Sequence, residues 1–235
     1  MKKLRIDIWS DIACPWCYVG KRRLEAALAQ FSGRDAVEIV WRAFELDPSA
    51  PRVRDNSVSS AERLAKKYGT STAQAQGMID RMTNVARADG LDFHFERLQS
   101  GNTFDAHRVL HLALERGQQD AVKERFLRGY MSEGEPIGEP ETLVRLAAEV
   151  GLDAEDVRAT LATDAYAHEV RADEKEAREN GITGVPFFVF DRRYAVSGAQ
   201  PVEVFVRALT QVWNELRAKP MVFEEGAACG PDGCN

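Results

Sequence analysis

The chain has 235 residues, enough to bury a full hydrophobic core as one large domain or two small ones. Its formal net charge of −6 argues against nucleic acid or an anionic membrane surface as the main partner. No apolar run approaches the length of a membrane span, so we expect no membrane partner either.

A first strand is predicted over residues 4–9, where apolar and mostly polar residues alternate, and a second over 37–44. Between them, apolar residues from Val19 to Phe31 recur at helical spacing. From about Ser57 the pattern becomes helical throughout. The candidate helices are residues 60–68, 72–89, 103–116, 119–131, 140–150, 154–162 and 165–180.

Local signals mark the ends of several of these helices. Ser59 with Glu62, and Ser71 with Gln74, have the spacing of capping boxes, in which two side chains satisfy free amides at a helix start. Glycines stand where helix C-termini are expected, at Gly69, Gly90, Gly117 and Gly151.

Strand character returns at residues 186–190, and a tight turn at 191–193 leads into a further strand at 194–196. An amphipathic helix over about 201–217 follows. We therefore predict an α/β fold, a four-stranded sheet interrupted by a large helical insertion that could form a lid. The predicted units are a sheet domain of residues 1–55 and 180–217, the insertion of residues 56–179, and a cysteine-containing tail of residues 218–235.

The segment Cys14-Pro15-Trp16-Cys17 stands between the first strand and the first helix. The free amides and the positive dipole end of a helix start stabilise a thiolate there. We expect Cys14 at the exposed edge, with a lowered pKa, and Cys17 one turn further in and more buried. Pro15 suits a first helical turn, and Trp16 offers an exposed apolar face to a partner polypeptide. This arrangement predicts redox chemistry.

Two other uses of the cysteines are open. The start Met1-Lys2-Lys3-Leu4 leads directly into the first strand without a signal-peptide pattern, so we expect a cytoplasmic protein, in which structural disulfides are rare. The pair could then be inert, or half of a zinc site with Cys229 and Cys234. The separation of the two pairs is far longer than in ordinary zinc modules, and we therefore predict no metal.

A second feature is the segment Gly181-Ile182-Thr183-Gly184-Val185-Pro186 before the third strand. A cis bond at Pro186 would shape a loop that faces the thiols. An ordinary proline at the start of a strand is the alternative.

Together, residues 11–18 (DIACPWCY), 181–188 (GITGVPFF) and 196–200 (VSGAQ), with the helical insertion, resemble the thioredoxin fold of the DsbA-like branch. The chain looks most similar to the FrnE-like cytoplasmic disulfide oxidoreductases. The resemblance implies that Cys14 is the nucleophile, Cys17 the resolving thiol and Pro186 the cis-proline. It also implies that the backbone of Val185 pairs with an extended substrate segment. Periplasmic DsbA proteins carry a histidine where this chain has Trp16, so the direction of net electron flow stays open.

Residues 102–107 (NTFDAH) are similar to a segment of the kappa-class glutathione transferases and the 2-hydroxychromene-2-carboxylate isomerases. Those relatives use serine at the place of Cys14 and handle glutathione and small molecules. A glutathione site beside Asn102 is therefore an alternative.

Three further groups of residues are candidates for a role in function. His107 and His111 lie one helical turn apart, a spacing that suits a metal but equally suits packing. Asp7 could accept a proton from Cys17 or could be a polar surface residue. In the tail, Cys229 and Cys234 bracket a turn-forming Gly-Pro-Asp-Gly sequence, and we predict a second redox pair that exchanges with the first.

The predicted function is a thiol-disulfide oxidoreductase, with isomerase activity as an extension, that acts on cysteine-containing proteins and is serviced by a thiol reductant. The dithiol itself is the redox group and no other cofactor is predicted; glutathione is one candidate electron donor. A glutathione-dependent transferase or isomerase and a redox- or zinc-responsive binding module are the alternatives.

Overall fold

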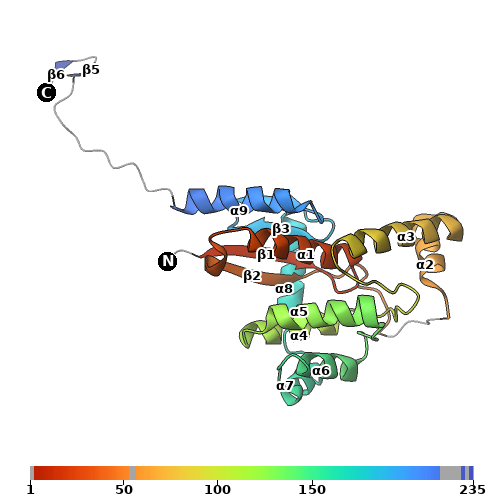
Figure 1. Cartoon of the computed structure of the whole chain (residues 1–235). Helices are drawn as coiled ribbons and strands as arrows, with labels where there is room; N and C mark the ends of the chain where they lie inside the picture. Colours follow the sequence, from red (N-terminus) through yellow and green to blue (C-terminus); the bar gives the residue numbers. More distant parts are fainter. Residues whose placement is uncertain (1–2, 53–56, 218–228, 231–232, 235) are drawn as a thin grey trace.

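The computed structural model describes residues 3–52, 57–217, 229–230 and 233–234. The chain begins with β1 (Leu4–Ser10), α1 (Pro15–Ala29), a 3-10 turn (Arg34–Ala36) and β2 (Val37–Ala43) (Figure 1). A run of helices follows, and then β3 (Phe187–Phe190), β4 (Tyr194–Ser197) and α9 (Val202–Arg217). The helices between are α2 (Ser60–Tyr68), α3 (Thr72–Ala88), α4 (Phe104–Glu115), α5 (Gln119–Arg128), α6 (Pro140–Ala148), α7 (Ala154–Leu161) and α8 (Ala167–Glu179).

The four long strands form one sheet in the order β2-β1-β3-β4. β1 runs parallel to β2, with Leu4 opposite Val37, because α1 carries the chain back along the sheet between them. β3 is antiparallel to β1 and to β4. The predicted α/β fold with a four-stranded sheet and a helical insertion is confirmed.

The helix signals in the sequence were accurate to within a few residues. Both predicted capping boxes form, at Ser59 and at Ser71. The predicted helix over 119–131 is different: the α-helix ends at Arg128, and residues Gly129–Glu133 form a short π-helix. The hairpin turn between β3 and β4 places Asp191 and Arg192 in the left-handed region, which matches the twist of the two strands.

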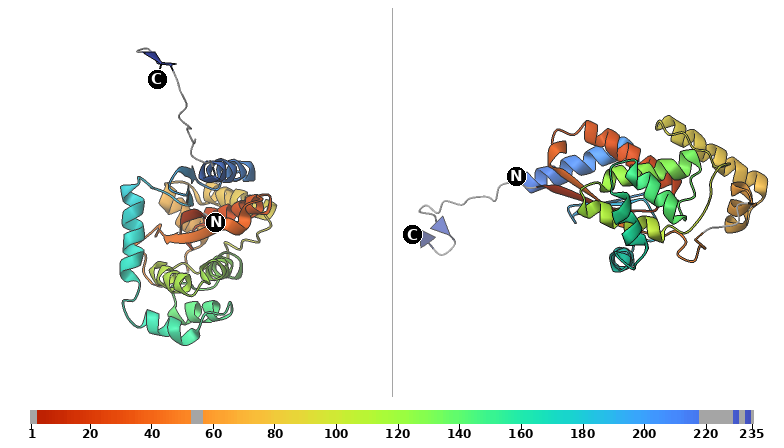
Figure 2. Two further views of the ribbon diagram at one scale, coloured as in Figure 1. Left: turned by 90° about the vertical axis from the view of Figure 1, so that its left-hand side faces the viewer. Right: turned by 90° about the horizontal axis from the view of Figure 1, so that it is seen from below.

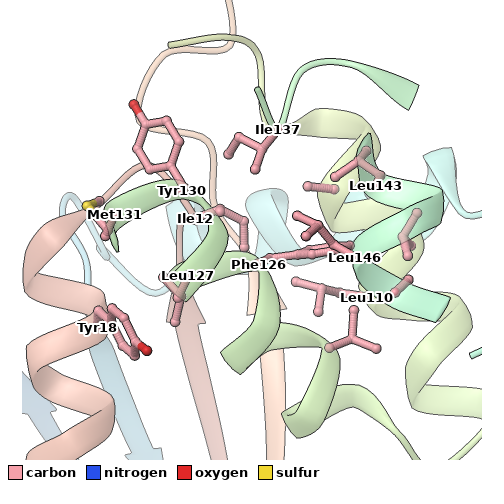
Figure 3. Packing of buried hydrophobic residues seen from close by; sticks show 14 of the residues in the cluster. Ile12, Tyr18, Leu110, Phe126, Leu127, Tyr130, Met131, Ile137, Leu143 and Leu146 are labelled. Atoms are coloured by element: carbon pink, nitrogen blue, oxygen red, sulfur yellow. The ribbon is translucent and has the colours of Figure 1, made fainter. Parts of the chain in front are cut away.

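Two apolar clusters fill most of the interior. The first, here called the sheet core, lies between the sheet and the helices α1 and α9; it includes Ile6, Leu24, Phe188 and Phe205. The second, the insertion core, is built mainly by α4, α5 and α6 and includes Phe126, Leu127 and Leu146 (Figure 3). α8 returns from the insertion toward the sheet (Figure 2) and packs Ala177 against Trp9 and Ile182.

The segment around the cysteines belongs to both cores. Ile12, Tyr18 and Val19 pack into the insertion core, and Figure 3 shows Ile12 beside Phe126 of α5. One turn later, Leu24 and Ala27 pack into the sheet core. The insertion is therefore more than a lid, because it shares a close-packed interior with the first turn of α1.

In the tail, β5 (Cys229–Gly230) pairs with β6 (Gly233–Cys234) in an antiparallel ladder that sets Cys229 opposite Cys234. Their side chains and residues 218–228 lie outside the described residues, so a bond between them and their exchange with the first pair stay predictions. Across the described ranges, none of the helices is long and apolar enough to cross a membrane.

Candidate active site

The two cysteines occupy the first turn of α1. Cys14 is the N-cap residue with an extended backbone, Pro15 begins the helix, and Cys17 lies in the first turn, where its amide donates to the Cys14 carbonyl at 3.1 Å. Both thiols are free. The side chain of Trp16 points outward with 43% of its surface exposed, as the sequence predicts. The strand-to-helix placement of the dithiol is thus confirmed.

The expected exposure of Cys14 is wrong. Cys14 is only 4% exposed, and Cys17 is fully buried. The cause is the loop before β3, which lies directly against the helix start: the Cys14 Sγ donates to the Val185 carbonyl at 3.6 Å. A long-range contact of this kind is not visible in the local sequence. The dithiol therefore sits under the loop, with only an edge of Cys14 open to solvent.

The Val185–Pro186 peptide bond is cis, as the sequence allows. The Pro186 carbonyl accepts from the Gly198 amide at 2.8 Å, which ties the loop to the end of β4. Gly20 faces the ring of Pro186: a Cβ on Gly20 would lie 3.0 Å from Pro186 Cγ and 3.1 Å from Phe188 Cζ. Glycine at position 20 thus lets α1 approach the loop closely enough for Cys14 to reach Val185.

The two thiols titrate as a linked pair. The hydrogen bond to Cys17, followed by burial, raises the pKa of Cys14 well above the ordinary value. Burial also opposes charge on Cys17, but the hydrogen bond from Cys14, the charge of Lys123 and the Ser10 hydroxyl together lower the pKa of Cys17. The predicted lowering of the Cys14 pKa is therefore wrong for the resting pair, in which contact with Cys17 and burial shift the pKa of Cys14 upward.

Lys123 is the main charge that the sequence analysis missed. It lies on α5, its side chain is fully buried, and its Nζ donates to the Ser10 carbonyl at 3.3 Å. Its ammonium also lies over the Trp41 ring, 5.4 Å from the ring centroid. A signal existed: Lys123 precedes Phe126 and Leu127 by three and four residues, so it shares their apolar helix face.

Asp11 organises the loop before the dithiol. Its carboxylate accepts from the Leu46 amide at 2.8 Å and from the Ala13 amide at 3.4 Å, and His107 Nε2 lies 3.5 Å from Asp11 Oδ1. Burial raises the pKa of Asp11, but the contacts with His107 and the Leu46 amide outweigh it, and the net shift is downward. An ionised Asp11 thus fixes the backbone from which α1 starts.

The other polar candidates lie elsewhere. Asp7 is buried and accepts from Arg5 and Arg42, so the surface position considered for it is wrong, while a role as proton acceptor for Cys17 stays a prediction. His111 faces Asp173 of α8, at 3.1 Å, while His107 faces Asp11, so the two histidines serve separate pairs. Within the described part of the chain, no group of three or more metal-ligating side chains comes together.

Asn102 is held by internal contacts. Its Nδ2 donates to Glu45 at 3.1 Å, and its Oδ1 accepts from the Phe104 amide at 2.8 Å. Glu45 is in turn ion-paired with Arg171 of α8 at 2.6 Å. Two surface hollows of about 570 and 830 Å³ are lined by neither Asn102 nor the cysteines. The glutathione site considered beside Asn102 stays a prediction.

The sequence matches a known protein family and a bacterial relative. The family model described as the DSBA-like thioredoxin domain matches residues 5–210. The uncharacterised protein YwbO of Bacillus subtilis (strain 168) is 30% identical over 209 residues, covering 88% of this chain and 96% of its own length.

Solved structures show the same relationship. The crystal structure of a probable DsbA oxidoreductase from Streptomyces coelicolor is 52% identical, covers 99% of this chain and 98% of its own, and superposes with a TM-score of 0.85. The cytosolic disulfide reductase DsbM of Pseudomonas aeruginosa, at 17% identity and a TM-score of 0.61, covers 89% of this chain and 98% of its own and shares the fold. With a buried dithiol at the start of α1 and a cis-proline loop against it, the chain belongs to the DSBA-like thioredoxin domain family.

Proposed function

We propose that the protein is a thiol-disulfide oxidoreductase that exchanges disulfides with protein cysteines through Cys14 and Cys17. With the shared proton on Cys17, the Cys14 thiolate attacks one sulfur of a substrate disulfide, and the departing substrate sulfur then takes up that proton, which leaves Cys17 as a thiolate. The Cys17 thiolate then attacks Cys14 in the mixed disulfide, closing the Cys14–Cys17 bond and releasing the second substrate sulfur as a thiolate. The reverse sequence oxidises a substrate dithiol.

The observation that carries the proposal is the pair of free thiols at a helix start under the loop of Val185 and Pro186. A lowered pKa on one member of the pair supplies the thiolate that exchange requires. Because Cys14 lies at the edge and Cys17 is fully buried, Cys14 is the sulfur that a substrate reaches first.

The surface around Cys14 is suited to bind an unfolded or extended protein segment. Trp16 and Leu46 are exposed apolar side chains, and Leu46 is attached to the dithiol loop through Asp11. An extended chain laid along the loop would meet the Val185 backbone and bring its disulfide to Cys14. We assign substrate binding to Trp16, Val185 and Pro186.

The cofactor, the reductant and the cellular location follow from this exchange chemistry. The exchange itself requires no metal, flavin or nucleotide, and a small thiol such as glutathione is a sufficient reductant. We place the protein in the cytoplasm, where a reducing thiol pool would keep Cys14 and Cys17 free. Nucleic acid and membrane have no role in the proposal.

The tail supplies the second redox pair of the proposal. Cys229 and Cys234 are opposite each other in the β5–β6 ladder, where cysteines can form a disulfide. We expect this pair to pass electrons to or from Cys14 and Cys17. A Cys229→Ser/Cys234→Ser variant should recycle the Cys14–Cys17 pair more slowly. If the redox state and the turnover of that pair were unchanged in the variant, the relay would be contradicted.

Reduction of insulin by dithiothreitol tests the main proposal. The wild type should accelerate the reaction, and Cys14→Ser should reduce the rate to that without protein. The variant lacking both tail cysteines is the matched control, because it removes two thiols from outside the site and dithiothreitol reduces the Cys14–Cys17 pair directly, without the relay. Full activity in Cys14→Ser would contradict the proposal. Glutathione-dependent turnover of small molecules in that variant would favour the transferase or isomerase alternative, and stoichiometric zinc without exchange would favour the binding module.

A further inference from the structure

The two faces of the sheet are covered unequally. On one face, Phe188 and Phe190 of β3 pack into the sheet core with α1 and α9. The other face is covered by α8, whose Asp173 accepts hydrogen bonds from Trp9 of β1 and from Ala43 of β2, both at 2.9 Å. Since the strand order is β2-β1-β3-β4, these contacts anchor α8 over the β2–β1 half of this face. The β3–β4 half lies beyond them.

A hollow of about 830 Å³, here called the β3 hollow, opens between α8 and the β3–β4 half. Because side chains alternate along a strand, Phe187 and Val189 point away from the sheet core and line the hollow, with Trp9 and Ile182 beside them. Phe187 and Val189 are only partly buried. The last strand of the sheet, β4, forms the opposite wall at Ala195. An apolar surface beside a strand edge is typical of a site that binds another chain.

The charged side chains at the rim of the β3 hollow balance one another. Three of the lining residues are acidic and three are basic. Lys175 lies 3.5 Å from Glu179, and Arg192 lies 3.8 Å from Glu176. A charged ligand would have to compete with these pairs, whereas an apolar side chain gains by covering the floor. The hollow therefore favours an apolar side chain.

The β3 hollow is continuous with the loop that covers the dithiol. Val185 packs in the same apolar cluster as Phe187 and Val189, while its carbonyl accepts from the Cys14 Sγ. Gly184 is exposed, and a Cβ on it would meet no atom of the described residues within 4 Å, so the loop is open to a chain that crosses it. A segment bound at Cys14 can thus pass over Val185 and reach the floor of the hollow.

We propose that the β3 hollow binds an apolar side chain of the same extended polypeptide whose disulfide reacts at Cys14. Val189 follows Val185 by four residues, which is about 13 Å of extended chain. A substrate in the same conformation covers that length in about four residues. The inference rests on the proposed function, and it narrows the substrates to unfolded polypeptides with an apolar residue about four positions from the reactive cysteine.

Peptides with one cysteine test the spacing. The cysteine is supplied as a disulfide with thionitrobenzoate, and a single phenylalanine replaces serine at one position at a time. Release of thionitrobenzoate by the reduced protein gives the rate constant of exchange. Phenylalanine about four residues from the cysteine should raise this constant about tenfold over serine, on one side of the cysteine only, because the chain crosses the loop in one direction. Equal constants at every position would overturn the inference.

Substitutions in the walls test the place of binding. Ala172 of α8 and Ala195 of β4 are exposed residues of the hollow, so a larger side chain fits there without disturbing the core. Ala172→Arg and Ala195→Arg should each lower the constant for the phenylalanine peptide about tenfold, to that of the serine peptide. Ala73→Arg is the matched control, because it changes an exposed alanine of α3 outside the hollow and should leave both constants unchanged. A preference that survives both wall variants would overturn the inference.

Oxidised glutathione distinguishes this inference from the proposed function, since it is too short to reach the β3 hollow. If neither oxidised glutathione nor any peptide exchanged with Cys14, the proposed function would be rejected. Exchange with oxidised glutathione, without a preference for the phenylalanine peptide, would reject only the inference.

Hydrogen–deuterium exchange locates the bound segment directly. In Cys17→Ser joined through Cys14 to the phenylalanine peptide, amides of residues 192–197 should exchange more slowly than in the same variant joined to the serine peptide. Protection of these amides in the free protein that is lost on dilution would assign the hollow to a second copy of the chain. Protection that is lost in Val222→Ser/Phe223→Ser would assign it to the chain's own tail. Either result would overturn the inference.

Discussion

The sheet core and the insertion core share helix α1, but they make different contributions to the dithiol. The sheet core contributes apolar contacts. Leu24 holds α1, the helix that begins at the dithiol, and Phe188 holds β3, the strand that follows the cis-proline loop. The insertion adds charge: Lys123 lies in the apolar face of α5, and His107 faces the acidic residue of the dithiol loop. The sheet side therefore holds the sulfurs in place, and the insertion brings a buried positive charge that lowers the pKa of Cys17.

The largest expected effect separates these two roles. Phe126 of the insertion core and Phe205 of the sheet core are both fully buried. Replacing either with alanine should lower the free energy of unfolding by about 3–5 kcal/mol, because each leaves a cavity. Urea denaturation measures this change. Only Phe126→Ala should also alter the alkylation rate of the thiols, since Phe126 lies one turn from Lys123 and packs with Ile12. Equal alkylation rates in both folded variants would contradict the division of roles.

A smaller effect is expected at the loop that joins the two cores. Asp11→Ala leaves the Leu46 and Ala13 amides without their acceptor, so unfolding should become easier by about 2 kcal/mol at pH 7. The pKa of Asp11 is lowered from 3.8, so the stabilisation by its ionised form is present above that value and is lost as pH falls through the lower folded pKa. The difference from wild type in urea denaturation should therefore shrink below about pH 4. A difference that is constant down to pH 2 would contradict an ionised Asp11.

The smallest effect concerns a single contact across the two regions. The Tyr18 hydroxyl donates to Glu124 of α5 at 2.6 Å, and Arg22 pairs with the same carboxylate. Because Glu124 is partly solvated and keeps Arg22, Tyr18→Phe should lower the free energy of unfolding by only about 1 kcal/mol. Thiol reactivity should not change. A loss as large as that of Phe126→Ala would mean that this hydrogen bond, and not the apolar core, holds the insertion to α1.

Local patterns in the sequence were enough for most of the fold. Capping residues such as Ser59 and the turn at Asp191 place helix and strand ends because they act over three or four residues. The α-helix predicted to residue 131 ends earlier, because nothing in the local sequence indicates the π-helix that begins at Gly129. The dithiol and Pro186 can be predicted because a short motif marks each of them: two cysteines three residues apart at a helix start, and a proline directly before a strand.

The protonation of the site could not be predicted in the same way. The burial of Cys14 comes from Val185, which lies 171 residues away in the chain, and the charge beside Cys17 comes from Lys123 on α5. The spacing of His107 and His111 suits a metal, but the His107 side chain faces Asp11 of the dithiol loop. Each of these contacts depends on packing between segments that are distant in sequence, so a single sequence shows the residues but not their partners.

The central claim, that Cys14 is the sulfur that meets the substrate and Cys17 the one that resolves, is tested most directly by trapping. In a background of Cys229→Ser and Cys234→Ser, the Cys17→Ser and Cys14→Ser variants are incubated with a protein disulfide or with oxidised glutathione and analysed by mass spectrometry. A stable mixed disulfide is expected at Cys14 in Cys17→Ser and almost none in Cys14→Ser, because Cys17 is fully buried. A mixed disulfide that accumulates at Cys17 in Cys14→Ser would contradict the central claim.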